Sequence, residues 1–248
     1  MFGIIYIVLS LLAGKELAEI LLFTGKNAQE AGSRNGQHKA FCNQIWLLAA
    51  AAFGMGTLVF GWTTYMISWA ASEAGAKKPL IYGNTAVLII TAVVLVLLYW
   101  KRYRKTGTVW IVADRKLISD SRAFRKECIL FGSLLVFLTW IMFYVFYIRN
   151  GELYSGFSVY GDYAPHTAMM RSFSKGNNFP TEYPHFGGQD VKYHFMFQFL
   201  VGNLEFLGIR LDFAYNIESV LALLGFLMLL YSIAKRLTAG LAAGILTL

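Results

Sequence analysis

Four apolar runs of more than 20 residues limit what this chain can fold into. A helix of about 20 residues spans the hydrocarbon core of a bilayer, which is roughly 30 Å thick. Hydrophobic residues make up 57% of the sequence and charged residues only 15%, a balance outside that of ordinary soluble proteins. We therefore predict an all-α fold, a polytopic transmembrane helical bundle. Its clear spans cover residues 45–71, 80–100, 128–148 and 213–234.

Both ends of the sequence are apolar as well. Residues 1–25 are long enough to span, but Lys15, Glu16 and Glu19 lie near the middle, where an isolated charge is costly. We interpret this segment as a weak span. The last residues, "LTAGLAAGILTL", stay apolar to the final position. We expect another helix to begin there and the sequence to be the N-terminal portion of a longer protein.

The basic residues are distributed unevenly between the loops. Residues 101–127 contain nine Lys/Arg against three acidic residues, whereas residues 149–210 contain five of each. Loops rich in Lys and Arg stay on the cytoplasmic side of a membrane. We therefore predict that the loop 101–127 is cytoplasmic and that the loop 149–210, one span further on, is exoplasmic. This distribution explains the net charge of +8 without a nucleic-acid partner.

The basic loop also suggests how the chain is divided. We predict an accessory transmembrane region over 1–105, a basic cytoplasmic loop over 106–127 and a second membrane region over 128–248. Cys42 and Cys128 both lie near the predicted cytoplasmic face, so neither a disulfide nor a cysteine metal site is indicated. The sequence contains no glycine-rich nucleotide loop and no HExxH, and we expect no nucleotide cofactor.

The exoplasmic loop concentrates the ionisable chemistry of the chain. Connections between bundle helices usually take about 2 to 8 residues, and this one is far longer. It contains three of the four histidines and is rich in aromatic residues, which favours a functional role over disorder. We predict a helix over "YAPHTAMMRSFS" capped by Asp162, with Pro165 in its first turn. Residues 175–190 are expected to form no regular element, and residues 193–208 an interfacial helix.

Asp162 is the leading candidate for a catalytic residue. A carboxylate just beyond a membrane helix can act as general base toward an acceptor hydroxyl, or bind a divalent cation. It stands four residues before His166, so the two share one helix face. The plain alternative is that Asp162 only caps the helix. If the protein uses a metal, Asp162 and His166 are its expected ligands.

The other candidates are imidazoles and cations that can contact a substrate. The spacings of the three loop histidines match no standard zinc pattern, so substrate contact is the preferred role. Guanidinium and ammonium groups suit a phosphate. The candidate substrate-binding residues are His166, Arg171, Lys175, His185, His194 and Arg210.

Three segments resemble the polytopic glycosyltransferase-C superfamily, in its branch of mannosyl- and arabinosyltransferase-like enzymes. They are "YGDYAPH" at 160–166, "YHFMFQFL" at 193–200 and "YSIAKRLTAGLAAG" at 231–244. The resemblance covers 128–248, which would be the start of the superfamily's membrane core. Two features depart from its pattern: Asp162 has no acidic neighbour, and Phe195 and Met196 stand where the superfamily has prolines.

The resemblance implies a function. The protein would be an integral-membrane glycosyltransferase, or its N-terminal part. It would transfer a sugar, with inversion, from a polyprenyl-phosphate donor to a glycan, lipid or protein acceptor. Asp162 matches the catalytic base, and His166 a substrate or metal contact. We expect the plasma membrane as its location. The alternative is a non-catalytic transporter subunit or assembly factor whose loop recognises a ligand.

Overall fold

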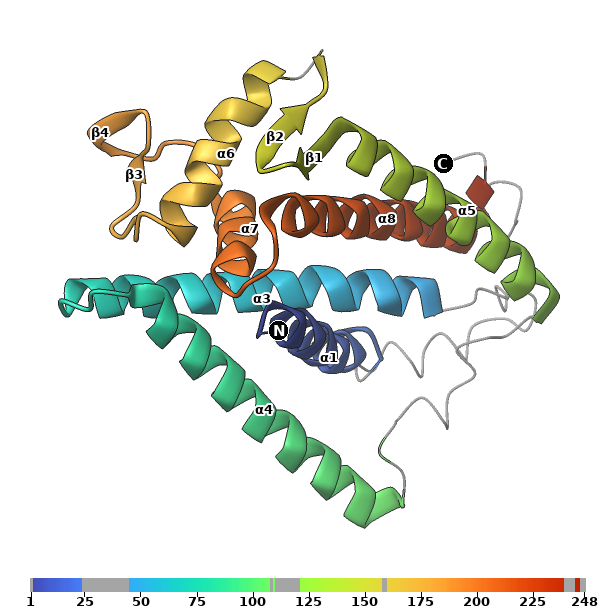
Figure 1. Ribbon diagram of the computed structural model, residues 1–248. Helices are drawn as coiled ribbons and strands as arrows, with labels where there is room; N and C mark the ends of the chain where they lie inside the picture. Colours follow the sequence, from blue (N-terminus) through green and yellow to red (C-terminus); the bar gives the residue numbers. More distant parts are fainter. Residues whose placement is uncertain are drawn as a thin grey trace. The chain divides into compact units, whose positions relative to one another are not determined.

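The computed structural model describes residues 2–23, 45–107, 109, 121–157, 160–238 and 244–245. This part of the chain is mostly helical, with four short strands (Figure 1). Most of the predicted basic loop and of the expected last helix lies outside the described residues. The described elements are α1 (Phe2–Phe23), α3 (Ile45–Glu73), α4 (Pro79–Thr106), α5 (Ser121–Val145), β1 (Phe146–Arg149), β2 (Glu152–Ser155), α6 (Tyr160–Ser174), β3 (Glu182–Tyr183), β4 (Phe186–Asp190), α7 (Met196–Phe206) and α8 (Leu211–Thr238).

Four helices are long and apolar enough to cross a membrane: α3, α4, α5 and α8. Each has at least 25 residues, and at a rise of about 1.5 Å per residue this exceeds the hydrocarbon thickness. They coincide with the four predicted spans and are consistent with a multi-pass membrane protein. The helix α1, which carries Lys15, Glu16 and Glu19, is not among them.

The chain forms two compact units. The first contains residues 1–10, 57–92 and 139–220, and the second contains 11–56, 93–138 and 221–248. Each unit draws residues from both sides of the basic loop. The predicted division into regions 1–105, 106–127 and 128–248 stays a prediction. Helix α5 begins at Ser121, inside the segment expected to be a loop.

Aromatic and aliphatic side chains from four helices build the core of the first unit. Tyr65 of α3 lies at its centre, with ring centroids 5.2 Å from Phe195 and 5.2 Å from Phe199. Its hydroxyl is 2.9 Å from that of Thr181. The remaining buried members are Leu80, Met169, Phe173 and Phe179. The segment between α5 and α8 is thus anchored on α3 and α4 by buried apolar surface.

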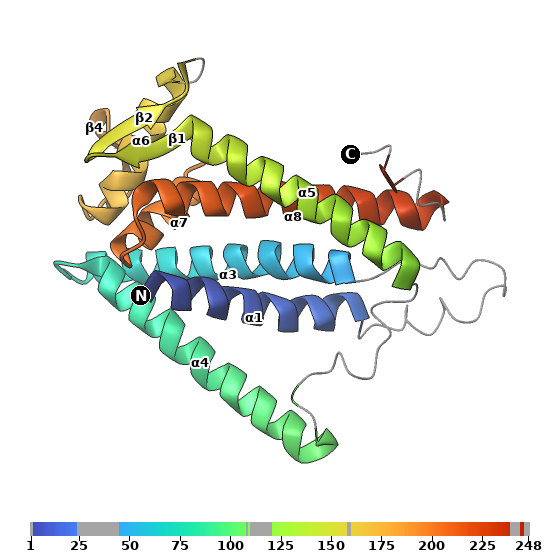
Figure 2. The ribbon, with the colours of Figure 1, turned by 45° about the vertical axis from the view of Figure 1, so that its right-hand side comes forward.

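A β-hairpin follows α5 directly, where the sequence predicted helix as far as residue 148 (Figure 2). The helix ends at Val145 because the backbone beyond it finds other partners. The carbonyl of Phe146 accepts from the Asn216 side chain at 2.7 Å, and the amide of Ile148 donates to Asp212 at 2.9 Å. Phe146 itself is fully buried.

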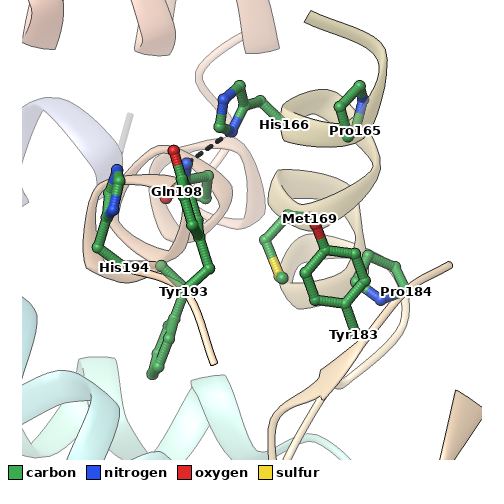
Figure 3. Close-up of a pocket in the computed structure, with 9 residues that line it drawn as sticks. Pro165, His166, Met169, Tyr183, Pro184, Tyr193, His194 and Gln198 are labelled. Atoms are coloured by element: carbon green, nitrogen blue, oxygen red, sulfur yellow. Dashed lines mark hydrogen bonds between the residues drawn. The ribbon is translucent and has the colours of Figure 1, made fainter. Parts of the chain in front are cut away.

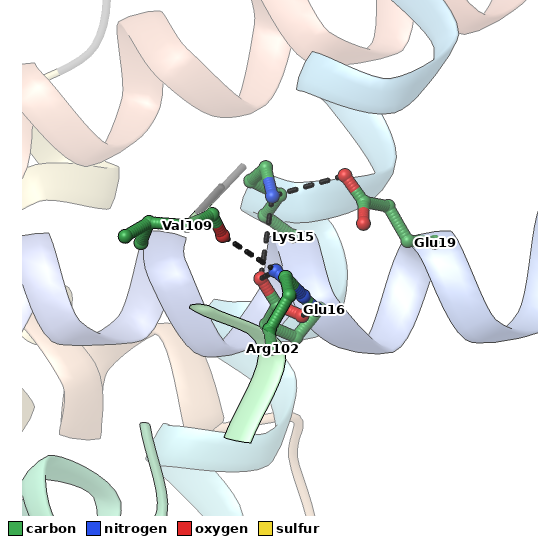
Figure 4. A network of polar contacts seen from close by, with 5 residues as sticks. All are labelled: Lys15, Glu16, Glu19, Arg102 and Val109. Atoms are coloured by element: carbon green, nitrogen blue, oxygen red, sulfur yellow. Dashed lines mark hydrogen bonds and ion pairs between the residues drawn. The ribbon is translucent and has the colours of Figure 1, made fainter. Parts of the chain in front are cut away.

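In the second unit, the charges of α1 are paired rather than isolated (Figure 4). Lys15 lies 3.2 Å from Glu16 and 2.9 Å from Glu19. Arg102, at the end of α4, donates to both carboxylate oxygens of Glu16, at 3.2 and 2.5 Å. Two cations and two carboxylates thus form a neutral network, which lowers the cost of burying them.

A second buried charge in the same unit is equally well partnered. Glu127 of α5 is 1% exposed. Its carboxylate accepts hydrogen bonds from the Trp46 indole at 2.9 Å and the Tyr231 hydroxyl at 2.6 Å, and it forms an ion pair with Lys235. These contacts tie α3, α5 and α8 together within the unit.

Candidate functional site

Helices α6 and α7 pack side by side in the first unit, as both ribbon views show (Figures 1 and 2). Their contact is close at Gly202 of α7. A β-carbon at this position would lie 2.3 Å from the carbonyl oxygen of Met170 on α6, so only glycine fits. This close approach brings the side chains of the two helices near enough to build a pocket.

The start of α6 differs from the prediction. The helix begins at Tyr160, so Asp162 lies within its first turn rather than at the N-cap, and Pro165 falls beyond that turn. The ring of Tyr163 stacks on Phe146 with centroids 4.8 Å apart and is 5.5 Å from Tyr215. Burial, together with Tyr215, raises the pKa of the Tyr163 phenol. The N-terminal turns of α6 are therefore docked on the hairpin strand β1 and on α8.

The prediction that residues 175–190 contain no regular element is wrong. Strands β3 and β4 pair antiparallel with an irregular register. Side-chain hydrogen bonds stabilise this small hairpin, because its ladder of backbone hydrogen bonds is short. The Asn178 amide bridges the backbone N–H and carbonyl of Glu182, both at 2.8 Å. The Glu182 carboxylate accepts from the amide of Gly188, whose φ of +79° suits glycine.

A pocket of about 190 Å³ lies between α6, α7 and the hairpin β3–β4 (Figure 3). Its walls combine aromatic and imidazole rings with one amide. None of the described residues that line it is Lys, Arg, Asp or Glu. The lining residues are Pro165, His166, Met169, Tyr183, Pro184, Tyr193, His194, Phe195 and Gln198.

The polar end of the pocket is built from His166 and Gln198. Gln198, on the first turn of α7, is 4% exposed, and its amide lies 2.8 Å from Nδ1 of His166 on α6 (Figure 3). The His166 ring is 6.0 Å from the ring of Tyr193, which itself lies against His194 at 3.8 Å. Rings from two histidines and one tyrosine thus face a common space.

The structure brings together only part of the predicted site. His166 and His194 both line the pocket. Asp162 lies one helical turn before His166, about 6 Å along the axis, exposed and without a hydrogen bond or ion pair to any described residue. His185 is exposed and does not line the pocket; its ring lies 5.7 Å from that of Tyr183.

The predicted cations lie outside the pocket, and two of them are paired. Arg171 lies 3.5 Å from Glu205 of α7. Arg210 donates to both carboxylate oxygens of the fully buried Asp212, at 2.6 and 2.8 Å, and this bond raises the pKa of its guanidinium. Lys175 is exposed, and its ammonium contacts no described residue. Lys175 is thus the candidate cation with the greatest freedom to meet an anion.

Metal ligands do not gather in the described part of the chain. No three His, Cys, Asp or Glu side chains there are grouped so as to hold an ion. Asp162 and His166 would have to recruit further ligands from elsewhere to form the metal site that the sequence left open.

A second cavity lies where α5 meets the hairpin β1–β2. It is open and aromatic, with Tyr147 and Tyr154 stacked at 5.1 Å and Phe157 92% exposed. Aromatic side chains at the end of a membrane helix are typical of an interfacial belt. Its lining residues are Phe143, Tyr144, Tyr147, Tyr154, Ser155, Gly156 and Phe157.

The sequence did not single out Gln198 as a member of this site. A polar residue inside an otherwise apolar helix was the only available signal for Gln198.

Comparisons with protein-family models, curated proteins and solved structures find no match to this chain. The resemblance to the glycosyltransferase-C superfamily therefore stays a prediction from sequence.

Proposed function

We propose that this protein is a multi-pass membrane glycosyltransferase, or the N-terminal part of one, and that the α6–α7 pocket binds the sugar of a polyprenyl-phosphate donor. The observation that carries the proposal is the chemistry of the pocket walls. Tyrosine and imidazole rings suit the apolar face of a sugar ring, and ring nitrogens and an amide suit its hydroxyls. The absence of charge among the lining residues favours a neutral ligand over a phosphate.

The proposed membrane topology supports the same function. With the loop 101–127 cytoplasmic, the segment from β1 to α7 lies on the exoplasmic side, between the spans α5 and α8. A polyprenyl phosphate keeps its chain in the bilayer and its sugar at the surface. A pocket in a segment bounded by two spans is within reach of that sugar. The plasma membrane is the proposed location.

Asp162 is the proposed general base. The acceptor hydroxyl attacks the anomeric carbon while the bond from that carbon to the phosphate oxygen breaks, with inversion. The hydroxyl proton passes to the Asp162 carboxylate, and the electron pair of the broken bond stays on the phosphate. Asp162 is exposed and unpaired among the described residues, so it is free to accept a proton.

The test is the rate of release of polyprenyl phosphate from lipid-linked sugars by the full-length protein in liposomes. Asp162→Asn is expected to lower this rate by about 10²- to 10⁴-fold, the usual contribution of general base catalysis. Asp190→Asn, which removes an exposed acid of β4 outside the pocket, is the matched control and should retain the rate. Full activity of Asp162→Asn would contradict the assignment of the base.

One observation favours the alternative, a non-catalytic transporter subunit. Glu218 in α8 is 3% exposed and has no hydrogen bond or ion pair to a described residue. Ionisable groups inside spans are typical of transport pathways. Under this alternative, the chain releases no polyprenyl phosphate from any lipid-linked sugar, and Glu218→Gln rather than Asp162→Asn abolishes function.

A further inference from the structure

The orientation of the Gln198 side chain is fixed by the backbone around it. One end of its amide faces the carbonyl oxygens of His194 at 3.2 Å and Phe195 at 3.3 Å, and the other end faces Nδ1 of His166 at 2.8 Å. Carbonyl oxygens accept hydrogen bonds and cannot donate them, so the NH₂ group of Gln198 must point toward these two oxygens. The amide oxygen is then left to face His166.

This orientation determines where the His166 ring carries its proton. An amide oxygen accepts hydrogen bonds and cannot donate one, so Nδ1 of His166 must be the donor. In a neutral imidazole only one nitrogen carries hydrogen, and the other is an acceptor. Nε2 of His166 therefore presents a lone pair, and no described residue hydrogen-bonds to it. The ring itself lines the pocket.

We infer that Gln198 is a positioning residue that holds His166 in the Nδ1–H tautomer, so that Nε2 accepts a hydrogen bond from a hydroxyl of the bound ligand. The inference rests on the proposed function for the identity of that ligand as a sugar. It also specifies the ligand chemistry further: the pocket requires a hydroxyl donor at this position. A phosphate or carboxylate, which offers only acceptors when ionised, would meet the lone pair of Nε2 without a hydrogen bond.

The packing explains why a glutamine is required. Gln198 is 4% exposed, so water cannot serve as the hydrogen-bond partner of either the NH₂ group or the oxygen of its amide. All three partners come from protein: two carbonyls that precede α7 and one imidazole from α6. Gln198, on the first turn of α7, thus determines which ring nitrogen of His166 on α6 carries the proton.

The experiment is ¹⁵N NMR of the full chain in detergent, with selective labelling of the four histidines. His166→Gln identifies the resonances of His166. In neutral imidazole a protonated ring nitrogen and an unprotonated one have widely separated ¹⁵N shifts. The expected result for the unaltered protein is a protonated Nδ1 and an unprotonated Nε2. A protonated Nε2, or an even mixture of tautomers, would overturn the inference.

Variants test the role of Gln198 itself. Gln198→Leu removes both amide groups and is expected to release His166 into a mixture of tautomers. Gln189→Leu makes the same change at an exposed position of β4 and should leave His166 as it is. Gln198→Glu retains an oxygen opposite Nδ1, so it should keep the Nδ1–H tautomer in alkaline buffer. This second variant gives a clear result even if Gln198→Leu fails to fold. An unchanged tautomer in a folded Gln198→Leu protein would contradict the positioning role.

Ligand binding separates this inference from the proposed function. Methyl hexosides and methyl pentosides are the neutral probes. The neutral probes should shift His166 Nε2, and Gln198→Leu should weaken their binding by about two- to fivefold, because only the fraction of His166 in the Nδ1–H tautomer can accept from the ligand. If the unaltered protein has the Nδ1–H tautomer but binds no sugar, the proposed function fails while the positioning role stands.

Discussion

Asn84 of α4 and Asn203 of α7 hydrogen-bond to each other through both of their amide groups. Each NH₂ group donates to the other residue's oxygen, at 2.6 and 2.9 Å, and both side chains are buried. Asn84 also donates to the carbonyl of Leu80 at 2.8 Å. This reciprocal pair fixes α7 against α4, one of the candidate spans, and therefore holds one wall of the pocket.

The pair should behave as a unit in unfolding experiments. Asn84→Leu or Asn203→Leu alone leaves a buried amide without its partner, which costs roughly 1–3 kcal/mol. The double variant removes both amides and should recover much of that loss. Thermal unfolding of the three variants in detergent measures the effect. Additive losses in the double variant would contradict the coupling.

The contact between α6 and α7 predicts opposite effects for two glycine substitutions. Gly202→Ala would put a β-carbon 2.3 Å from a backbone oxygen, and relieving such overpacking costs roughly 1–3 kcal/mol. It should also weaken sugar binding, because the pocket lies between these helices. Gly161→Ala, on α6 with open space around it, should stabilise the helix by roughly 0.5–1 kcal/mol. Equal effects of the two substitutions on thermal unfolding would argue against the close approach.

The predicted topology has a direct chemical test. With Cys42 and Cys128 replaced by Ser, Gln189→Cys and Lys105→Cys each introduce one thiol at an exposed position. A membrane-impermeant maleimide should label Gln189→Cys in intact cells, and Lys105→Cys only after permeabilisation. The reverse pattern would invert the proposed orientation, and labelling of both in intact cells would contradict the span between them.

The four spans could be predicted from sequence because a continuous apolar run needs no tertiary information. The hairpin β1–β2 could also have been predicted. Asn150 and Gly151 have φ values of +53° and +83° and form its two-residue loop, and Asn-Gly is a strong signal for such a turn. The apolar run of α5 concealed this signal, since it continues through Phe146 and Ile148.

The pocket could not be predicted in the same way. Asn203 and Gln198 appeared only as polar interruptions of an apolar helix. Their partners Asn84 and His166 lie 119 and 32 residues away in sequence, and no local pattern identifies such pairs. Asp162 and His166 were correctly predicted to share a helix, yet only His166 lines the pocket. Which residue of a helix faces a cavity depends on how its neighbour packs, here on Gly202.

The most direct test of the central claim is equilibrium binding of polyprenyl-phosphate-linked sugars to the full-length protein in nanodiscs. A panel of radiolabelled hexose and pentose lipids is the probe, with Tyr193→Ala as the pocket variant and Gln189→Leu as the control. The account predicts saturable binding of at least one sugar lipid. The matching methyl glycoside should compete, Tyr193→Ala should weaken the binding, and Gln189→Leu should not. Binding that unglycosylated polyprenyl phosphate displaces equally well, or that Tyr193→Ala leaves unchanged, would contradict a sugar site in the α6–α7 pocket.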